Sequence, residues 1–335
     1  MATITAIKSG NWSDPTVWDS GTLPQSGDTA KPGGFAVVID QDVDLGAGAL
    51  EGTAGAAGYF RVNAEGITIT CDHLQNTNGN LLKLYHTTGQ VYINANIRCG
   101  TDYAKDCVQV LAAGGLTVVG DVTGGSANSS WGINVNAGDV ANSPGLHVTG
   151  NVTGGTGYGS SGIMVYYGWD ITVVGDVSAG PQGAGPLHGE STGVRGLYAK
   201  NITVYGTVRA TNNGHGVVGS GRVNSYPLLI TVHGDVYACD DPDPDALFFY
   251  PGISTFGTTY NKVVVHGRLY DGAHGVPAVE GRVFRDVAYP QSYIDLPYID
   301  PATNEITVQR LYHRMPGAVI GSTVTAREAI ASILD

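Results

Sequence analysis

The stretch Ile171-Thr-Val-Val-Gly-Asp-Val177 is one copy of a seven-residue pattern, apolar-x-apolar-x-Gly-x-apolar, that recurs along the chain. Other clear copies span residues 116–122, 146–152, 202–208, 230–236 and 263–269, and weaker ones span 37–43, 67–73 and 91–97. In the weaker copies Gln41, Cys71 and Ala95 take the place of the glycine. Because apolar and polar residues alternate and many are β-branched, each copy predicts a β-strand with one buried face.

The spacing of the copies predicts how these strands are arranged. The glycine position falls at residues 41, 71, 95, 120, 150, 175, 206, 234 and 267, which are 24 to 33 residues apart. A second short strand precedes the pattern in several repeats, as at 108–111, 133–135, 163–166 and 217–218. This period is too short for a propeller blade, and the leucine-rich consensus is missing, whereas one turn of a solenoid fits. The sequence therefore predicts an all-β fold, a right-handed parallel β-helix of about nine coils; a β-sandwich or jelly roll is the main alternative, because its strands also alternate.

Composition excludes several other classes of protein. Of the 335 residues, 50 are glycine, 14% are charged and 42% are hydrophobic, and the net charge is −12. These values argue against a charged coiled coil and simple disorder, and the lack of a fixed glycine period argues against collagen. The acidic balance argues against a nucleic-acid or membrane partner. With no bilayer-spanning apolar run and no signal-peptide pattern, we expect synthesis in the cytoplasm and four reduced cysteines.

Stacked coils would place equivalent residues in ladders. Two inward ladders are predicted from the first and third pattern positions: Val37, Ile67, Val91, Leu116, Leu146, Ile171, Ile202, Ile230 and Val263; and Ile39, Ile69, Ile93, Val118, Val148, Val173, Val204, Val232 and Val265. The residue after the glycine position is aspartate or asparagine in seven of the nine copies. This column could line a metal-binding groove. We favour a structural role in which the side chains bond the backbone, since stacked carboxylates repel one another.

The ends of the chain depart from the repeat. Three segments are predicted: an N-terminal cap over 1–35, the β-helix over 36–280, and an irregular C-terminal docking segment over 281–335. Trp12 and Trp18 are expected to plug the first coil, because a solenoid must cover its terminal core. Residues 325–334 predict a short helix, in which Thr325 and Glu328 have capping-box spacing.

Aromatic residues suggest two ligand-binding surfaces. Tyr205, His233 and His266 occupy the position before the glycine in the last three coils, which predicts one outward column. A second aromatic group contains Tyr166 and Trp169. Either group could bind a glycan; the alternatives are a solvated strand face for the column, and core stacking or a subunit contact for the second group.

An acidic run, Asp240-Asp-Pro-Asp-Pro-Asp245, suggests the one cofactor considered, Ca²⁺. Its candidate ligands are Asp240, Asp241, Asp243 and Asp245. The run lacks the glycine and final glutamate of an EF-hand, so we favour a solvated turn between coils. A glycosidase acid pair is a further alternative, although one loop seldom supplies both carboxylates. No catalytic residues are assigned, because no nucleophile or zinc motif occurs and lysine, a candidate lyase base, is scarce.

The string Ser9-Gly-Asn-Trp-Ser-Asp-Pro-Thr-Val-Trp18, followed by Leu23-Pro24 and Gly27-Asp28, resembles the lead-in of right-handed β-helix proteins from bacteriophage virions and bacterial surfaces. The resemblance covers residues 9–45 and brings no catalytic residues. It implies a non-enzymatic virion structural protein, a capsid decoration or head fibre component that docks through its terminal segments to capsid or tail proteins. Similar phage proteins are trimers, so a homotrimer is expected. The alternatives are a tailspike-type protein that binds or cleaves host polysaccharide, and a bacterial adhesin, which the missing signal peptide disfavours.

Overall fold

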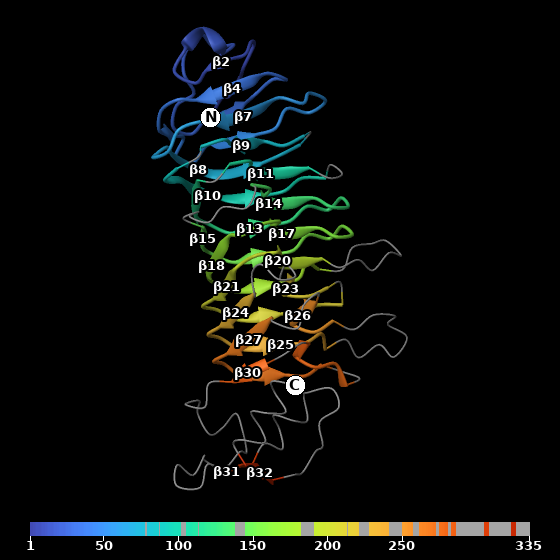
Figure 1. Ribbon diagram of the computed structural model, residues 1–335. Coiled ribbons are helices and arrows are strands. Elements are labelled where there is room, and N and C mark those ends of the chain that lie inside the picture. Colours follow the sequence, from blue (N-terminus) through green and yellow to red (C-terminus); the bar gives the residue numbers. More distant parts are fainter. Residues whose placement is uncertain are drawn as a thin grey trace.

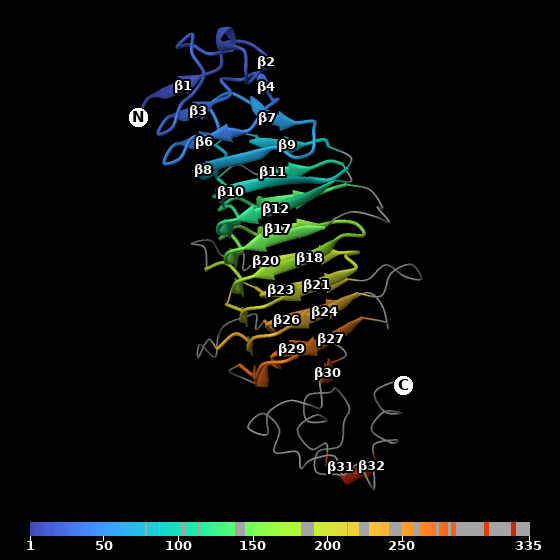
Figure 2. The same ribbon diagram turned by 90° about the vertical axis from the view of Figure 1, so that its left-hand side faces the viewer.

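The computed structural model is an elongated parallel β-solenoid of about nine turns (Figure 1 and Figure 2). It describes residues 1–77, 79–86, 88–101, 105–112, 114–137, 145–181, 191–212, 214–220, 228–240, 250–256, 261–272, 275–280, 283–285, 305–307 and 323–325. Two long sheets, of 19 and 11 strands, run along it. Within the described residues every strand pair in these sheets is parallel, which confirms the solenoid and contradicts the sandwich alternative.

In the first sheet, each clear copy of the pattern forms two short strands separated by the glycine. These are β12 (Gly115–Val119) and β13 (Val122–Thr123), β15 (Leu146–Thr149) and β16 (Val152–Thr153), β18 (Asp170–Val174) and β19 (Val177–Ser178), β21 (Asn201–Val204) and β22 (Val208–Arg209), β24 (Leu229–Val232) and β25 (Val236–Tyr237), and β27 (Lys262–Val265) and β28 (Leu269–Tyr270). Where cysteine or alanine replaces the glycine, the strand continues unbroken, as in β8 (Thr68–Gln75) and β10 (Gln90–Arg98). The other strands of this sheet are β1 (Thr3–Thr5), β3 (Thr29–Lys31), β5 (Val43–Asp44), β6 (Ala49–Glu51) and β30 (Val283–Arg285).

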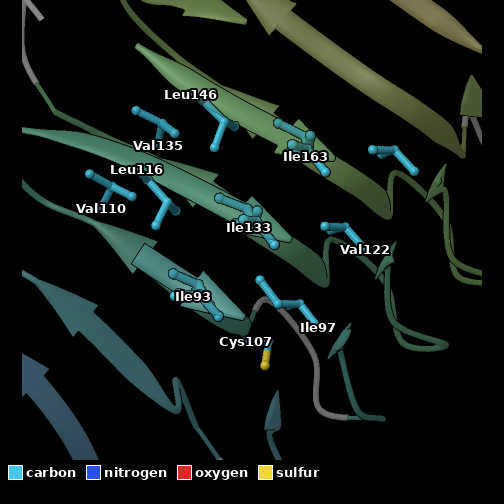
Figure 3. Close-up of a cluster of buried hydrophobic side chains, with 14 of the residues drawn as sticks. Ile93, Ile97, Cys107, Val110, Leu116, Val122, Ile133, Val135, Leu146 and Ile163 are labelled. Carbon is cyan, nitrogen blue, oxygen red and sulfur yellow. The ribbon is translucent and has the colours of Figure 1, made fainter. Parts of the chain in front are cut away.

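The second sheet supplies the opposite wall of the core. Its strands are β2 (Gly10–Asn11), β4 (Ala36–Ile39), β7 (Tyr59–Val62), β9 (Leu82–Leu84), β11 (Asp106–Val110), β14 (Trp131–Val135), β17 (Ser161–Val165), β20 (Thr192–Leu197), β23 (Val217–Ser220), β26 (Ile253–Phe256) and β29 (Val279–Glu280). Figure 3 shows Ile93 and Leu116 of the first sheet with Val110 and Ile133 of the second in one buried cluster. Burial of aliphatic side chains from both walls is the main stabilising term of such a core.

Register pairing confirms the predicted inward ladders from the third copy onward. Val91, Leu116, Leu146, Ile171, Ile202, Ile230 and Val263 are successive partners. The second ladder is continuous from Ile69 through Ile93 and Val118 to Val265. All of these side chains are buried.

The first copy does not continue the predicted ladders. Val37 pairs with Phe60, so β4 belongs to the second sheet, and only Val43 of that copy reaches the first sheet, opposite Ile69. Alternation with period two occurs in both walls, and without the glycine nothing in the local pattern separates them.

The second copy ends one residue later than predicted. Thr70 pairs with Asn94, but His73 pairs with Asn96, so β8 contains one extra residue at this point. Leu74, not His73, therefore continues the apolar column toward Ile97. Such a bulge shifts every later side chain by one position.

Residues of the predicted N-terminal segment already form strands of both sheets, because β1 pairs with β3 and β2 pairs with β4. The short 3-10 helix η1 (Pro15–Val17) lies between the buried Trp12 and Trp18. Near the C-terminus β31 (Glu305–Thr307) and β32 (Thr323–Thr325) form an antiparallel pair. Thr325 ends β32, and the rest of the predicted helix lies outside the described residues. In the described part of the chain, no helix combines the length and apolar character needed to cross a membrane.

Candidate functional site

The Asp/Asn column at the glycine corner bonds the backbone of the next coil. The Asn151 N–H donates to Oδ1 of Asp121 at 2.7 Å, and the Asp176 N–H donates to Oδ1 of Asn151 at 2.9 Å. The Thr207 N–H donates to Oδ1 of Asp176 at 2.7 Å. These bonds support the structural interpretation of the column, because the side chains satisfy backbone donors at the point where the strands are interrupted.

We predict that Asp176→Ala lowers the free energy of unfolding by about 1 kcal/mol, since the Thr207 N–H loses its acceptor. Asp176→Asn is the matched control, because an amide oxygen can accept the same bond. It should change stability by less than about 0.5 kcal/mol. Urea unfolding followed by circular dichroism compares the two, and an equal loss in both variants would contradict the hydrogen-bonding role.

The structure brings Tyr205, His233 and His266 together in one stack. The Tyr205 and His233 ring centroids are 4.5 Å apart at 3°, and those of His233 and His266 are 4.7 Å apart at 8°. The three residues directly follow β21, β24 and β27, and the N–H groups of the two histidines donate to carbonyl oxygens of the preceding coil. Regular backbone pairing thus sets the ring spacing.

This stacking determines what the column can offer a ligand. Both faces of His233 are covered by neighbouring rings, so this ring presents only its edge and its nitrogen atoms to solvent. Burial, and then His266, lower the pKa of His233, which favours the neutral ring. The middle of the stack is therefore suited to hydrogen bonding with a polar ligand and not to face-to-face stacking on a sugar ring.

A second stack lies beside the first on the same three coils. Arg209, Tyr237 and Tyr270 are register partners in β22, β25 and β28. The tyrosine ring centroids are 4.3 Å apart at 2°, and the Arg209 guanidinium lies 4.0 Å from the centre of the Tyr237 ring. Sequence reasoning missed this stack, although its signal was present: the residue three positions after each glycine changes to Arg, Tyr and Tyr.

Between the stacks, the corner column carries polar and charged groups. Oδ1 of Asp235 accepts a hydrogen bond of 2.7 Å from the backbone N–H of Arg268. Oδ2 of Asp235 accepts one of 3.4 Å from the Tyr237 hydroxyl. Interaction with Tyr270 raises the pKa of Arg268 further, so its guanidinium stays charged. These three coils thus carry ring edges, hydroxyl groups and two cations on either side of the glycine corner.

The second predicted aromatic group does not join this surface. Tyr166 follows β17 of the second sheet and is half-buried, with its ring centroid 6.1 Å from that of Trp131 at 75°. Trp169 is fully buried in the core, so it is not a surface residue. Its burial fits the core-stacking interpretation of this residue.

The acidic run is only partly described. Asp240 is exposed and comes shortly after β25, whereas Asp241, Asp243 and Asp245 lie outside the described residues. Among the described residues no group of three or more His, Cys, Asp or Glu side chains has metal-binding geometry. The Ca²⁺ hypothesis stays a prediction.

No protein-family model, curated protein or solved structure gives a significant match to this chain.

Proposed function

We propose that this chain is a non-enzymatic structural protein of a bacteriophage virion, a capsid decoration or head fibre component that docks through its terminal segments. The observation that carries the proposal is the continuous parallel pairing of strands from β1 to β30. Each internal coil is hydrogen-bonded to the coil on either side and contributes to one continuous core. A rod built in this way resists bending, which suits a component that projects from a particle.

The assignment to a virion rests on the resemblance of residues 9–45 to phage β-helix proteins. The ends are proposed as docking points because the terminal coils of a solenoid have strand edges that no further coil pairs. We expect a homotrimer, as in the similar phage proteins, and a major capsid or tail protein as the partner.

Mass spectrometry of purified particles tests this proposal. We expect the chain at a fixed copy number per particle that matches capsid or tail symmetry, and antibody labelling should locate it on the head. Absence from particles produced in cells that express the chain would overturn the proposal. Sedimentation of the purified protein tests the trimer separately.

A second candidate is a tailspike-type protein that binds host polysaccharide. The observation in its favour is the pair of stacks, Tyr205–His233–His266 and Arg209–Tyr237–Tyr270, exposed on neighbouring columns of the same coils. Hydroxyl groups and guanidinium ions are suited to sugar hydroxyls and carboxylates.

We expect Arg209→Ala and Tyr205→Ala each to weaken glycan binding roughly tenfold or more if this surface is the site. Tyr92→Ala is the control, because Tyr92 is an exposed tyrosine on β10, several coils away. A host-glycan array gives the readout. The candidate fails if no glycan binds, or if Tyr92→Ala reduces binding as much as the other two variants do.

A further inference from the structure

A carboxyl group is buried on the second sheet without a counter-charge beside it. Asp106, the first residue of β11, is 2% exposed, and its Oδ2 accepts a hydrogen bond of 2.9 Å from Nδ2 of Asn134 in β14. Asn134 is 4% exposed. The Asp106 backbone N–H donates to Oδ1 of Asn80 at 3.0 Å.

Two oxygen atoms of the Asp106–Asn134 pair accept no hydrogen bond. Oδ1 of Asp106 and Oδ1 of Asn134 are both buried and have no hydrogen-bond partner. Buried polar atoms are normally satisfied. A carboxylate cannot donate to an amide oxygen, so the ionised form leaves both oxygens without a partner. A proton on Oδ1 of Asp106 would turn one of these acceptors into a donor that the other can accept.

The charged neighbours do not neutralise a carboxylate at this position. Lys105 and Lys83 act on Asp106 from a distance, but neither forms an ion pair within 4.0 Å of it in the described structure. Lys83 instead places its Nζ 3.9 Å from the centre of the Tyr59 ring. Burial raises the pKa of Asp106 to about 7, against the lowering effects of Asn134, Lys105 and Lys83.

Two other titratable groups near Asp106, Tyr166 and Cys99, supply no compensating charge. Burial, and then Asp106, raise the pKa of Tyr166, while Arg195 lowers it. Burial, and then Asp106, raise the pKa of Cys99 to about 12. Both groups are thus neutral near pH 7 and supply no positive charge.

We propose that Asp106 is a neutral carboxylic acid in the folded protein and forms a cyclic acid–amide pair with Asn134, which makes the contact between the β11 and β14 coils sensitive to pH. In this pair Oδ1–H of Asp106 donates to Oδ1 of Asn134, and Nδ2–H of Asn134 donates to Oδ2 of Asp106. Deprotonation removes one of the two bonds and leaves a buried charge. The pair is thus a pH-dependent contact between two neighbouring coils.

The raised pKa of Asp106 determines how the stability of the folded protein changes with pH. Between about pH 4 and about pH 7 the folded protein retains a proton that the unfolded chain releases. The contribution of the protonated Asp106 to the free energy of unfolding is therefore fully present at about pH 4. It decreases as the pH rises and is lost above about pH 7.

Selective ¹³C labelling of aspartate carboxyl groups tests the proposal. The signal that disappears in Asp106→Asn should titrate near pH 7 in the wild-type protein. Titration below about pH 5, the ordinary range for aspartate, would overturn the proposal. This readout needs only a folded wild-type protein and one folded variant.

Stability measurements give an independent check. Asp106→Asn mimics the neutral acid, because its Nδ2 can donate to Asn134 and its Oδ1 can accept. We expect this variant to be more stable than wild type at about pH 8 and to lack the loss of stability between about pH 4 and about pH 7. Lower stability of Asp106→Asn at pH 8 would indicate a required carboxylate and would also overturn the proposal.

The reciprocal double variant is the matched control. Asp106→Asn combined with Asn134→Asp keeps one acid and one amide in the pair with their positions exchanged. It should regain the pH dependence that Asp106→Asn lacks. Failure to regain it, in a double variant with a wild-type circular dichroism spectrum, would count against the cyclic pair.

Discussion

Replacing Gly150 with alanine is expected to lower the free energy of unfolding by about 3 kcal/mol, because no space for a methyl group exists between the coils. Gly150 separates β15 from β16, and its φ is +149°. A Cβ atom there would lie 2.3 Å from the carbonyl oxygen of Gly120 in the preceding coil. That oxygen belongs to backbone, so relief requires two paired coils to move apart.

Gly66→Ala is the control for a positive φ without close contacts. Gly66 has a φ of +78°, but a Cβ atom there would meet nothing within 4 Å. Its substitution should cost about 1–2 kcal/mol, the strain of the left-handed region alone. Urea unfolding of both variants measures the difference, and equal losses would show that close approach of the coils is not the reason for glycine.

Gly150 is one member of a column with the same contact. A Cβ at Gly120 would lie 2.2 Å from the oxygen of Ala95, and one at Gly175 would lie 2.1 Å from the oxygen of Gly150. Ala95 itself is accommodated because β10 runs through this position as a continuous strand. The glycine requirement thus begins where the strand is interrupted.

This contact explains why the sequence predicts the first sheet so well. Glycine at a fixed place within an alternating stretch marks the corner, and the corner sets the register of every coil from Val91 onward. The same reasoning failed for residues 37–43, because alternation alone does not distinguish the two walls. It also failed at His73, since one extra residue between Thr70 and His73 leaves no compositional signal.

The candidate surface was predictable only as a set of columns. Register placed Tyr205, His233 and His266 together, but stacking face to face depends on side-chain rotamers that sequence does not specify. The burial of Trp169 was not predictable either, because aromatic composition does not indicate which side of the wall a ring faces. The Asp106–Asn134 pair could not be predicted, since the two residues are 28 positions apart and their significance lies in burial.

Replacing Trp18 with alanine is expected to lower the free energy of unfolding of the N-terminal coils by about 3–5 kcal/mol. Trp18 is buried, and its ring centroid is 4.9 Å from that of Trp12 at 75°. Its Nε1–H donates to the carbonyl oxygen of Trp12 at 3.1 Å. The Trp12 ring in turn lies 5.9 Å from Phe60 in β7. Removal of the Trp18 side chain therefore leaves a cavity at the end of the core, and Trp12 loses its ring contact and its hydrogen-bond donor.

The effect of Trp18→Ala should be local, because each coil of a solenoid contacts only its neighbours. Amide hydrogen exchange should show lost protection in β1 to β4 and wild-type protection in β18 to β27. Trp18→Phe is the control: it keeps most of the ring volume and loses the indole hydrogen bond, so its cost should be about 1–2 kcal/mol. Uniform loss of protection along the chain would instead mean that the solenoid unfolds as one cooperative unit, and that the tryptophan pair stabilises the rod as a whole.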